Sequence, residues 1–289
     1  MLYDLLIEPF AEFEFMRRAL VGSLALSLGA APIGVFLMLR RMSLTGDAMA
    51  HAILPGAAIG YLLAGLSLPA MTIGGLVAGL AVALGAGAVA RATVLKEDAT
   101  LAAFYLISLA LGVVIVSARG SNVDLLHVLF GSVLALDDQT LLLLAGVGTG
   151  TLIALAVILR PLVLECVDPA FLRSVSHAGA RVHFTFMALV VMNLVGGFHA
   201  LGTLLAVGIM MLPAAAARLW TNDLSGLIGI SVVIAGLSSI GGLLLSYHLS
   251  LPSGPAIILV AGGAYALSLV FGRAGGAIRH LLPARHLEA

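Results

Sequence analysis

The sequence predicts an all-α fold: a polytopic membrane bundle of about eight to nine transmembrane helices, within a single transmembrane domain over residues 1–289. Three observations lead to this prediction. Hydrophobic residues make up 61% of the chain and charged residues only 10%, whereas a soluble domain carries about 25% charged residues. Apolar runs of about 20 residues, the length that crosses a bilayer, recur along the chain. The 34 glycines suit helices that pack closely in lipid.

The apolar runs define nine candidate spans. They are residues 19–39, 49–66, 70–90, 99–118, 140–159, 184–199, 201–219, 226–247 and 254–272. The stretch 184–219 leaves two alternatives, either two short spans that meet near Gly202 or one long broken helix. Pro55 and Pro213 are expected to break their helices. Broken helices in transporters line cavities and free backbone carbonyls for ligands.

The distribution of basic residues predicts the orientation, since cytoplasmic loops gather Lys and Arg. With the N-terminus outside and nine crossings, eleven of the 14 Lys and Arg residues fall inside. If 184–219 were one span, the split would be seven against seven. The bias therefore favours nine crossings, with the C-terminus in the cytoplasm.

Two segments between the spans are expected to form short helices. Residues 123–136 are apolar but too short to cross, so the outer segment 120–139 is predicted to be an interfacial or re-entrant helix. The inner segment 160–183 contains Asp168 and Pro169, a cap followed by proline that typically starts a helix. A short cytoplasmic helix there, ending before Gly179, would suit docking onto a partner.

Asp47 and His51 stand four residues apart at the start of the second span, so their side chains share one face of a helix. A carboxylate inside a membrane is costly and marks a functional site by default. Oxygen and imidazole nitrogen together suit a divalent transition metal. The alternative is that Asp47 only caps the helix. Two ligands do not complete a metal site, so others would come from water, His199, His248 or a second copy of the chain.

Further histidines are expected near the outer face. Asp124 and His127, three residues apart, would form either a weak outer metal site or a solvated cap beside an interfacial histidine. His127, His199 and His248 could supply the steps before the Asp47/His51 pair, or be interfacial residues with satisfied hydrogen bonds.

Several function classes are excluded by missing motifs. The chain has no G-x-x-x-x-G-K-[ST] motif, and Lys96 is its single lysine, so it cannot bind ATP through a P-loop. It has neither the H-E-x-x-H motif of a zincin nor a G-x-S-x-G nucleophile elbow. Its zero net charge gives no indication of nucleic-acid binding. The chain is therefore not expected to be an enzyme.

The chain resembles, over nearly its whole length, the permease subunits of bacterial zinc/manganese-type ABC importers. The residues that carry the resemblance lie in five stretches. They are Arg41–Gly56, Val123–Gly131, Val167–Pro169, Leu201–Leu205 running on to Leu212–Arg218, and Leu251–Pro255.

The resemblance implies a homodimer, two cytoplasmic ATP-binding subunits that hydrolyse ATP, and an extracytoplasmic metal-binding protein that delivers the ion. It implies that Asp47 and His51 contribute to the transmembrane metal site. It also implies that the segment around 168–182 couples to the ATPase. The coupling candidates are Asp168, Pro169, Phe171, Arg173, His177 and Arg181, although the residues after Pro169 depart from the family's usual Ala-rich pattern.

ATP-driven import of Zn²⁺ is the leading hypothesis, because the extra histidines favour zinc. Mn²⁺ or Fe²⁺ import is the alternative, and a secondary metal transporter without an ATPase is a second class. No permanently bound cofactor is expected.

Overall fold

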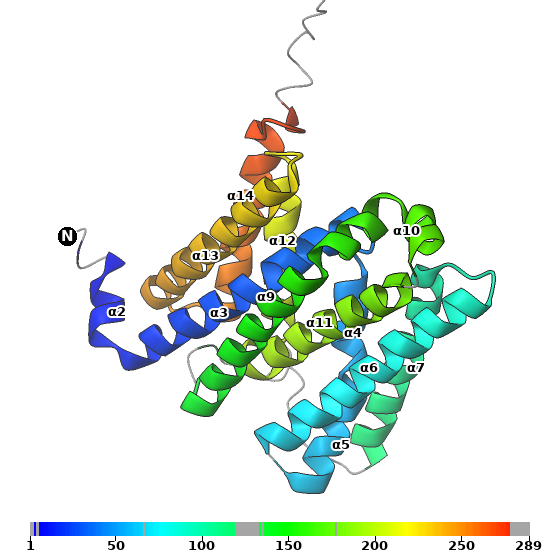
Figure 1. The fold of residues 1–289 in the computed structure, drawn as a ribbon. Coiled ribbons are helices and arrows are strands. Elements are labelled where there is room, and N and C mark those ends of the chain that lie inside the picture. The colour runs from blue at the N-terminus through cyan, green and yellow to red at the C-terminus, as the bar shows by residue number, and fades with distance from the viewer. Residues whose placement is uncertain are drawn as a thin grey trace, which may run out of the picture.

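The computed structural model describes residues 3, 6–65, 67–118, 133, 136–176 and 178–277, and the regular elements in this part of the chain are all helical (Figure 1). The helices are α2 (Glu8–Glu12), α3 (Glu14–Leu39), α4 (Thr45–Ala52), α5 (Leu54–Ala64), α6 (Leu68–Ala92), α7 (Glu97–Ala118), α9 (Asp138–Val167), α10 (Pro169–Val175), α11 (Ala178–Leu201), α12 (Thr203–Arg218), α13 (Leu224–Leu249) and α14 (Ser253–Phe271). The predicted all-α class is confirmed.

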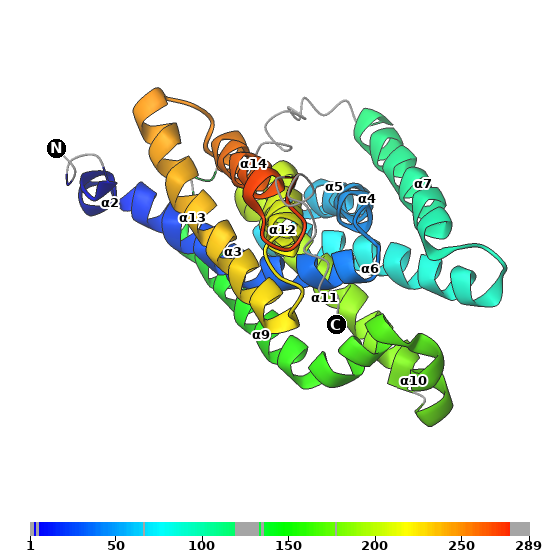
Figure 2. The same ribbon diagram turned by 90° about the horizontal axis from the view of Figure 1, so that it is seen from above.

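Eight segments are long and apolar enough to cross a membrane, with α4 and α5 forming one of them, and α12 is a shorter apolar helix. The predicted number of eight to nine spans is therefore confirmed. The centre of the bundle is formed by α3 and α11, whose most apolar windows are each 72% buried, whereas the window in α7 is 22% buried. Figure 2 shows α7 at one flank of the bundle. Phe36 and Phe186 meet edge-on between the two central helices, with ring centroids 6.2 Å apart.

The two ends of the bundle differ in their ionic contacts. At one end the last residues of α3 lie against α9 and α11, because Arg40 contacts both Glu165 and His183. At the opposite end Arg18 of α3 pairs with Asp138 at the start of α9, at 3.2 Å. We call the first the arginine-rich end, because Arg40, Arg41, Arg91 and Arg218 lie there. The chain also reaches this end after α14, where the Ala274 N–H donates to the carbonyl of Leu219, at 2.8 Å.

The stretch 184–219 is a helical hairpin rather than one broken helix. Gly202, between α11 and α12, has a φ of 89°, a conformation that non-glycine residues rarely adopt. A Cβ placed on Gly197 would lie 2.7 Å from the Cβ of Ala206. Nine residues of straight helix would instead separate these positions by about 13 Å. The chain therefore reverses at Gly202, and α12 returns to the arginine-rich end.

The two prolines that were expected to break helices behave differently. The helix of the second span is interrupted at Ile53, two residues before Pro55. The expected break at Pro213 is wrong, because α12 runs through that residue. Pro213 is buried, and the carbonyl that loses its N–H donor is that of Ile209, four residues earlier. Packing of α12 against α3, α13 and α14 holds the helix together across the missing bond.

Aspartates cap three of the helices. Asp137 accepts from the N–H of Thr140, Asp168 from Phe171 and Asp223 from Gly226. The hydroxyl of Ser225 and the N–H of Gly226 lower the pKa of the exposed Asp223 carboxyl. These caps fix where α9, α10 and α13 begin.

Candidate functional site

Asp47 and His51 lie on one face of α4, as their spacing predicts. The Nε2 atom of His51 is 3.8 Å from Oδ1 of Asp47. The Asp47 side chain is 69% exposed and that of His51 33% exposed. Asp47 is not the helix cap, because α4 begins at Thr45 and its cap position is Leu44. The alternative role considered for Asp47 is therefore wrong, and its carboxylate is open to a ligand.

The pair lies part of the way along the bundle rather than at its end. The His51 ring is 6.4 Å from the ring of Tyr105, which is eight residues into α7, about 12 Å from that helix's start. The Ser108 hydroxyl, at the middle of α7, donates to the carbonyl of Ala52 at 3.0 Å. His51 therefore sits between a third and a half of the way across from the arginine-rich end, and Asp47 one turn nearer that end.

One face of α7 supports the interruption between α4 and α5. Tyr105, Ser108 and Gly112 follow the i, i+3, i+7 spacing of a single helix face. A Cβ on Gly112 would lie 3.3 Å from the nitrogen of Pro55, so the two helices approach closely there. This face of α7 was not predicted from the sequence, since α7 reads as an unremarkable apolar span.

Pro55 removes one backbone hydrogen bond beside the pair. In an unbroken helix the N–H of residue 55 would donate to the carbonyl of His51, and proline has no N–H. That carbonyl accepts instead from the N–H of Ile53. The carboxylate of Asp47 and the imidazole of His51 offer oxygen and nitrogen to a cation. Such a mixed set suits a first-row divalent metal.

The remaining predicted ligands are not brought to this pair within the described residues. No cluster of three or more His, Cys, Asp or Glu side chains suited to a metal occurs in the described part of the chain. His248 is near the end of α13 opposite the arginine-rich end, where its ring stacks edge-on against Tyr247 at 5.2 Å. Asp124 and His127 lie outside the described residues, as does the side chain of His199 in α11.

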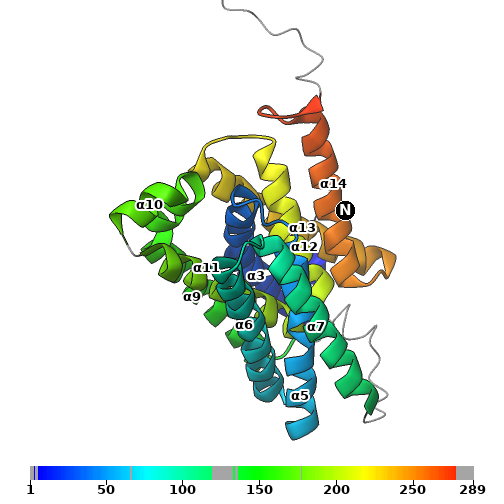
Figure 3. The same cartoon turned by 90° about the vertical axis from the view of Figure 1, so that its right-hand side faces the viewer.

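The predicted partner-docking segment forms a separate helix. Asp168 Oδ1 accepts from the Phe171 N–H at 2.9 Å, which makes Asp168 the cap and Pro169 the first residue of α10. Phe171 is 52% exposed, and Arg181 in the next helix is exposed as well. Figure 3 shows α10 projecting beyond the ends of α9 and α11. The side chains of Pro169 and Arg173 and the whole of His177 lie outside the described part.

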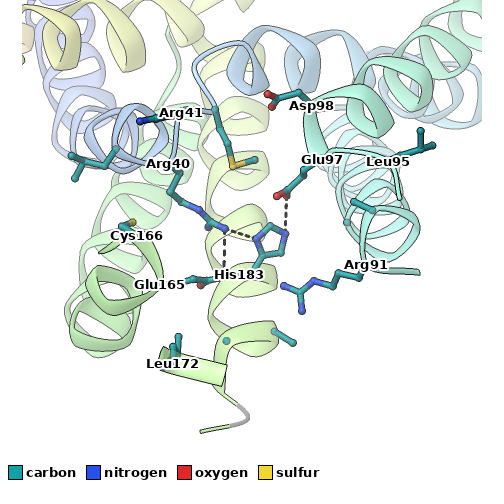
Figure 4. Close-up of a pocket in the computed structure, with 16 residues that line it drawn as sticks. Arg40, Arg41, Arg91, Leu95, Glu97, Asp98, Glu165, Cys166, Leu172 and His183 are labelled. Carbon is teal, nitrogen blue, oxygen red and sulfur yellow. Dashed lines mark hydrogen bonds and ion pairs between the residues drawn. The ribbon is translucent and has the colours of Figure 1, made fainter. Parts of the chain in front are cut away.

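A cavity of about 1030 Å³ opens at the arginine-rich end. It is walled by the ends of α3, α6, α7 and α9 and by α10 and α11. Figure 4 shows Arg40 and His183 pointing toward one another inside it. The Arg40 Nη2 atom lies 2.6 Å from Nδ1 of His183 and 3.5 Å from Oε1 of Glu165, and Nε2 of His183 lies 3.0 Å from Oε1 of Glu97.

Sequence reasoning missed these four side chains. They are far apart in the chain, and charges near the ends of apolar runs are usually solvated. Arg40, Glu165 and His183 are instead buried, with side chains only 10%, 11% and 3% exposed. The signal was present in Glu165, because it follows an apolar run and precedes Asp168 by three residues, where a solvated acid has no evident role.

The comparisons with known proteins agree with this architecture. The model of the ABC 3 transport family matches residues 12–272. The manganese import system permease protein ScaB of Streptococcus parasanguinis is 32% identical over 91% of this chain and 92% of its own length. A probable iron transport system membrane protein of Haemophilus influenzae is 29% identical, over 94% of this chain and 98% of its own.

The structure of PsaBC from Streptococcus pneumoniae in complex with a Fab superposes with a TM-score of 0.84 at 28% identity, covering 98% of this chain and all of that one. The family match, the helical bundle and the missing ATP-binding motif assign the chain to the membrane part of a transporter. The chain therefore belongs to the ABC 3 transport family and is the permease subunit of a metal-ion ABC importer, not its ATPase.

Proposed function

We propose that this permease imports Mn²⁺, that Asp47 and His51 bind the ion on its way across the membrane, and that two copies of the chain form the pathway. The observation that carries the proposal is the position of the pair. An imidazole and a carboxylate lie 3.8 Å apart, part of the way along the bundle from the arginine-rich end and beside a helix interruption.

The exposure of Asp47 supports a homodimer. In a lone chain this carboxylate, 69% exposed and within the span of the bundle, would face lipid at a high cost. A second copy covering α4 removes that cost and can bring a second Asp47/His51 pair to the same ion. Ligands from two chains would also supply the coordination that one chain lacks.

Manganese replaces zinc as the preferred ion. The expectation of zinc rested on extra histidines, and His248 does not join the pair. What remains is one imidazole with the two oxygens of a carboxylate, and oxygen-rich sets suit Mn²⁺ better than Zn²⁺. The name of the Streptococcus parasanguinis relative points to manganese, while the Haemophilus influenzae name keeps Fe²⁺ as the second candidate.

The orientation and the partners complete the proposal. We place the arginine-rich end in the cytoplasm, because basic residues are retained there. α10, at that end, would dock onto a cytoplasmic ATP-binding subunit through Phe171 and the residues around it. A metal-binding protein outside the membrane would deliver the ion to the opposite end. The membrane would be the bacterial plasma membrane, in keeping with the bacterial relatives.

The test uses the complete importer in proteoliposomes, with uptake of Mn²⁺, Fe²⁺ and Zn²⁺ measured separately. Asp47→Asn and His51→Gln should each abolish uptake while the permease stays folded in the membrane. Glu12→Gln removes a carboxylate from α2, at the opposite end, and should transport normally. Normal uptake by both site variants would reject the site, and faster uptake of Zn²⁺ than of Mn²⁺ would reject the preferred ion.

A further inference from the structure

Four ionisable side chains, three of them buried and one half-buried, link four helices across the cavity at the arginine-rich end. We call Glu165 of α9, Arg40 at the end of α3, His183 of α11 and Glu97 of α7 the ionic relay. Arg40 is its centre, because the Nη2 atom contacts both Glu165 and His183. His183 in turn contacts Glu97 through its Nε2 atom.

The chemistry of the partners fixes the proton on His183. A guanidinium only donates, so the Nδ1 atom that lies 2.6 Å from Arg40 must accept, and the ring proton is on Nε2. That nitrogen faces the Glu97 carboxylate at 3.0 Å, at ion-pair distance but without full hydrogen-bond alignment. A neutral His183 therefore joins a cation on one side to an anion on the other.

The relay is expensive to bury and incompletely satisfied. Taking charges out of water costs several kcal/mol per ion, so buried ion pairs are weak contributors to stability. Nη1 of Arg40 and Oε2 of Glu165 are buried and have no hydrogen-bond partner in the protein. The pair is thus joined by one 3.5 Å contact, although an arginine and a carboxylate can form two parallel bonds. The pair therefore keeps one unused donor and one unused acceptor, which a second conformation could join.

The position of the relay in the chain indicates what it connects. Glu165 is three residues before Asp168, the cap of α10, and His183 is five residues after the start of α11. Both connections of α10 therefore converge on Arg40. Arg40 in turn is five residues before Thr45, the start of α4. Glu97 begins α7, the helix whose face supports the interruption beside His51.

We propose that the ionic relay transmits the movement of α10 to the Asp47/His51 segment, so that Arg40 and His183 are positioning residues for coupling ATP hydrolysis to metal transport. This inference rests on the proposed function. When the docked ATPase moves α10, Glu165 and His183 shift with it. Arg40 exchanges its single contact with Glu165 for two parallel hydrogen bonds to the same carboxylate, and this displaces the start of α4.

The experiment measures metal ions transported per ATP hydrolysed, using the complete importer in proteoliposomes with Mn²⁺ and its delivery protein. Arg40→Gln should lower this ratio at least ten-fold, because ATP hydrolysis continues while transport is lost. His183→Phe should lower it as well, since a phenyl ring can neither accept from Arg40 nor donate to Glu97. Arg91→Gln is the matched control. Arg91 lines the same cavity and lies 4.9 Å over the Phe184 ring. Its charge also acts on Glu97 and Glu165, but the ion pairs and hydrogen bonds of the relay are made by Arg40 and His183. Removing its charge without removing those contacts should leave the ratio normal.

A double variant separates coupling from stability. Arg40→Gln leaves the Glu165 carboxylate buried and unpaired, which lowers the melting temperature of the permease. Arg40→Gln with Glu165→Gln removes that charge and should restore the melting temperature while the ratio stays low. If the ratio recovers together with the melting temperature, the relay is only structural and the inference is overturned. A normal ratio in Arg40→Gln itself overturns it too.

Metal binding distinguishes this inference from the proposed function. The relay variants should bind Mn²⁺ within about two-fold of the unmodified permease, because Asp47 and His51 are intact. If the unmodified importer takes up no metal at all, the proposed function fails. If it takes up Mn²⁺ and the relay variants stay coupled, only the relay inference fails.

Discussion

The hydroxyl of Ser108 donates a 3.0 Å hydrogen bond to the carbonyl of Ala52, the residue that follows His51. The bond ties the end of α4 to the middle of α7 at the level of the proposed metal pair. Ser108 is buried, with 7% exposure, so its hydroxyl has no competing water. A peripheral, lipid-facing helix thereby holds a central functional segment in place.

Ser108→Ala should weaken Mn²⁺ binding about five-fold, since a buried hydrogen bond contributes about 1 kcal/mol and its loss lets the end of α4 relax. Ser23→Ala removes a hydroxyl that bonds only within α3, to the carbonyl of Leu20, and should bind metal normally. Equal affinities for the two variants, measured by titration calorimetry on the purified permease, would show that α7 does not position the pair.

Gly56→Ala should destabilise the permease by about 1–3 kcal/mol through overpacking. Its Cβ would lie 2.0 Å from the carbonyl oxygen of Gly74 in α6, and backbone cannot move aside as a side chain can. Gly262→Ala is the control within α14, because a Cβ there meets nothing within 4 Å. Thermal unfolding in detergent should lower the melting temperature of the first variant only, and a normal melting temperature for both would contradict this close approach.

Asp168→Ala should weaken binding of the ATP-binding subunit, because loss of the cap costs about 0.5–2 kcal/mol and lets the first turn of α10 fray. Asp168→Ser keeps an oxygen at the cap position and should retain most of the binding. Copurification of the two subunits from membranes gives the comparison. Full recovery of the partner with the alanine variant would mean that α10 does not need its folded start.

The hairpin at Gly202 predicts which loops share a side of the membrane. Cys166 is the single cysteine, so a Cys166→Ser chain provides a clean background for labelling with an impermeant maleimide. Ser176→Cys and Thr221→Cys, before α11 and after α12, should both label from the cytoplasmic side, and Ser250→Cys only from the outside. If Ser176→Cys and Thr221→Cys label from opposite sides, α11 and α12 do not form a hairpin in the membrane.

The large features were predictable because hydropathy and local chemistry determine them. Apolar runs located the spans, and the Asp168–Pro169 pair located the start of α10. The four-residue spacing placed Asp47 and His51 on one face. Each of these depends on residues that are close together in the chain.

The features that escaped prediction depend on tertiary packing. Pro213 does not break α12, because neighbouring helices compensate for the lost hydrogen bond. The ionic relay brings together side chains from four helices, namely Arg40, Glu97, Glu165 and His183. No local sequence pattern predicts that these side chains are in contact. The proposal of manganese in place of zinc has a similar origin, since counting histidines ignores whether they share a site.

The turn between α11 and α12 is buried, with Ala200 3%, Leu201 0% and Thr203 6% exposed. At 16 residues, about 24 Å, α12 is also shorter than the roughly 30 Å hydrocarbon layer. Hydropathy searches tuned to bilayer thickness will therefore undercount spans in relatives of this permease. Epitope tags inserted near Gly202 would disrupt the interior instead of reporting topology, whereas the loop at Ser250, at the end opposite the arginine-rich end, offers a site where a reporter can be displayed.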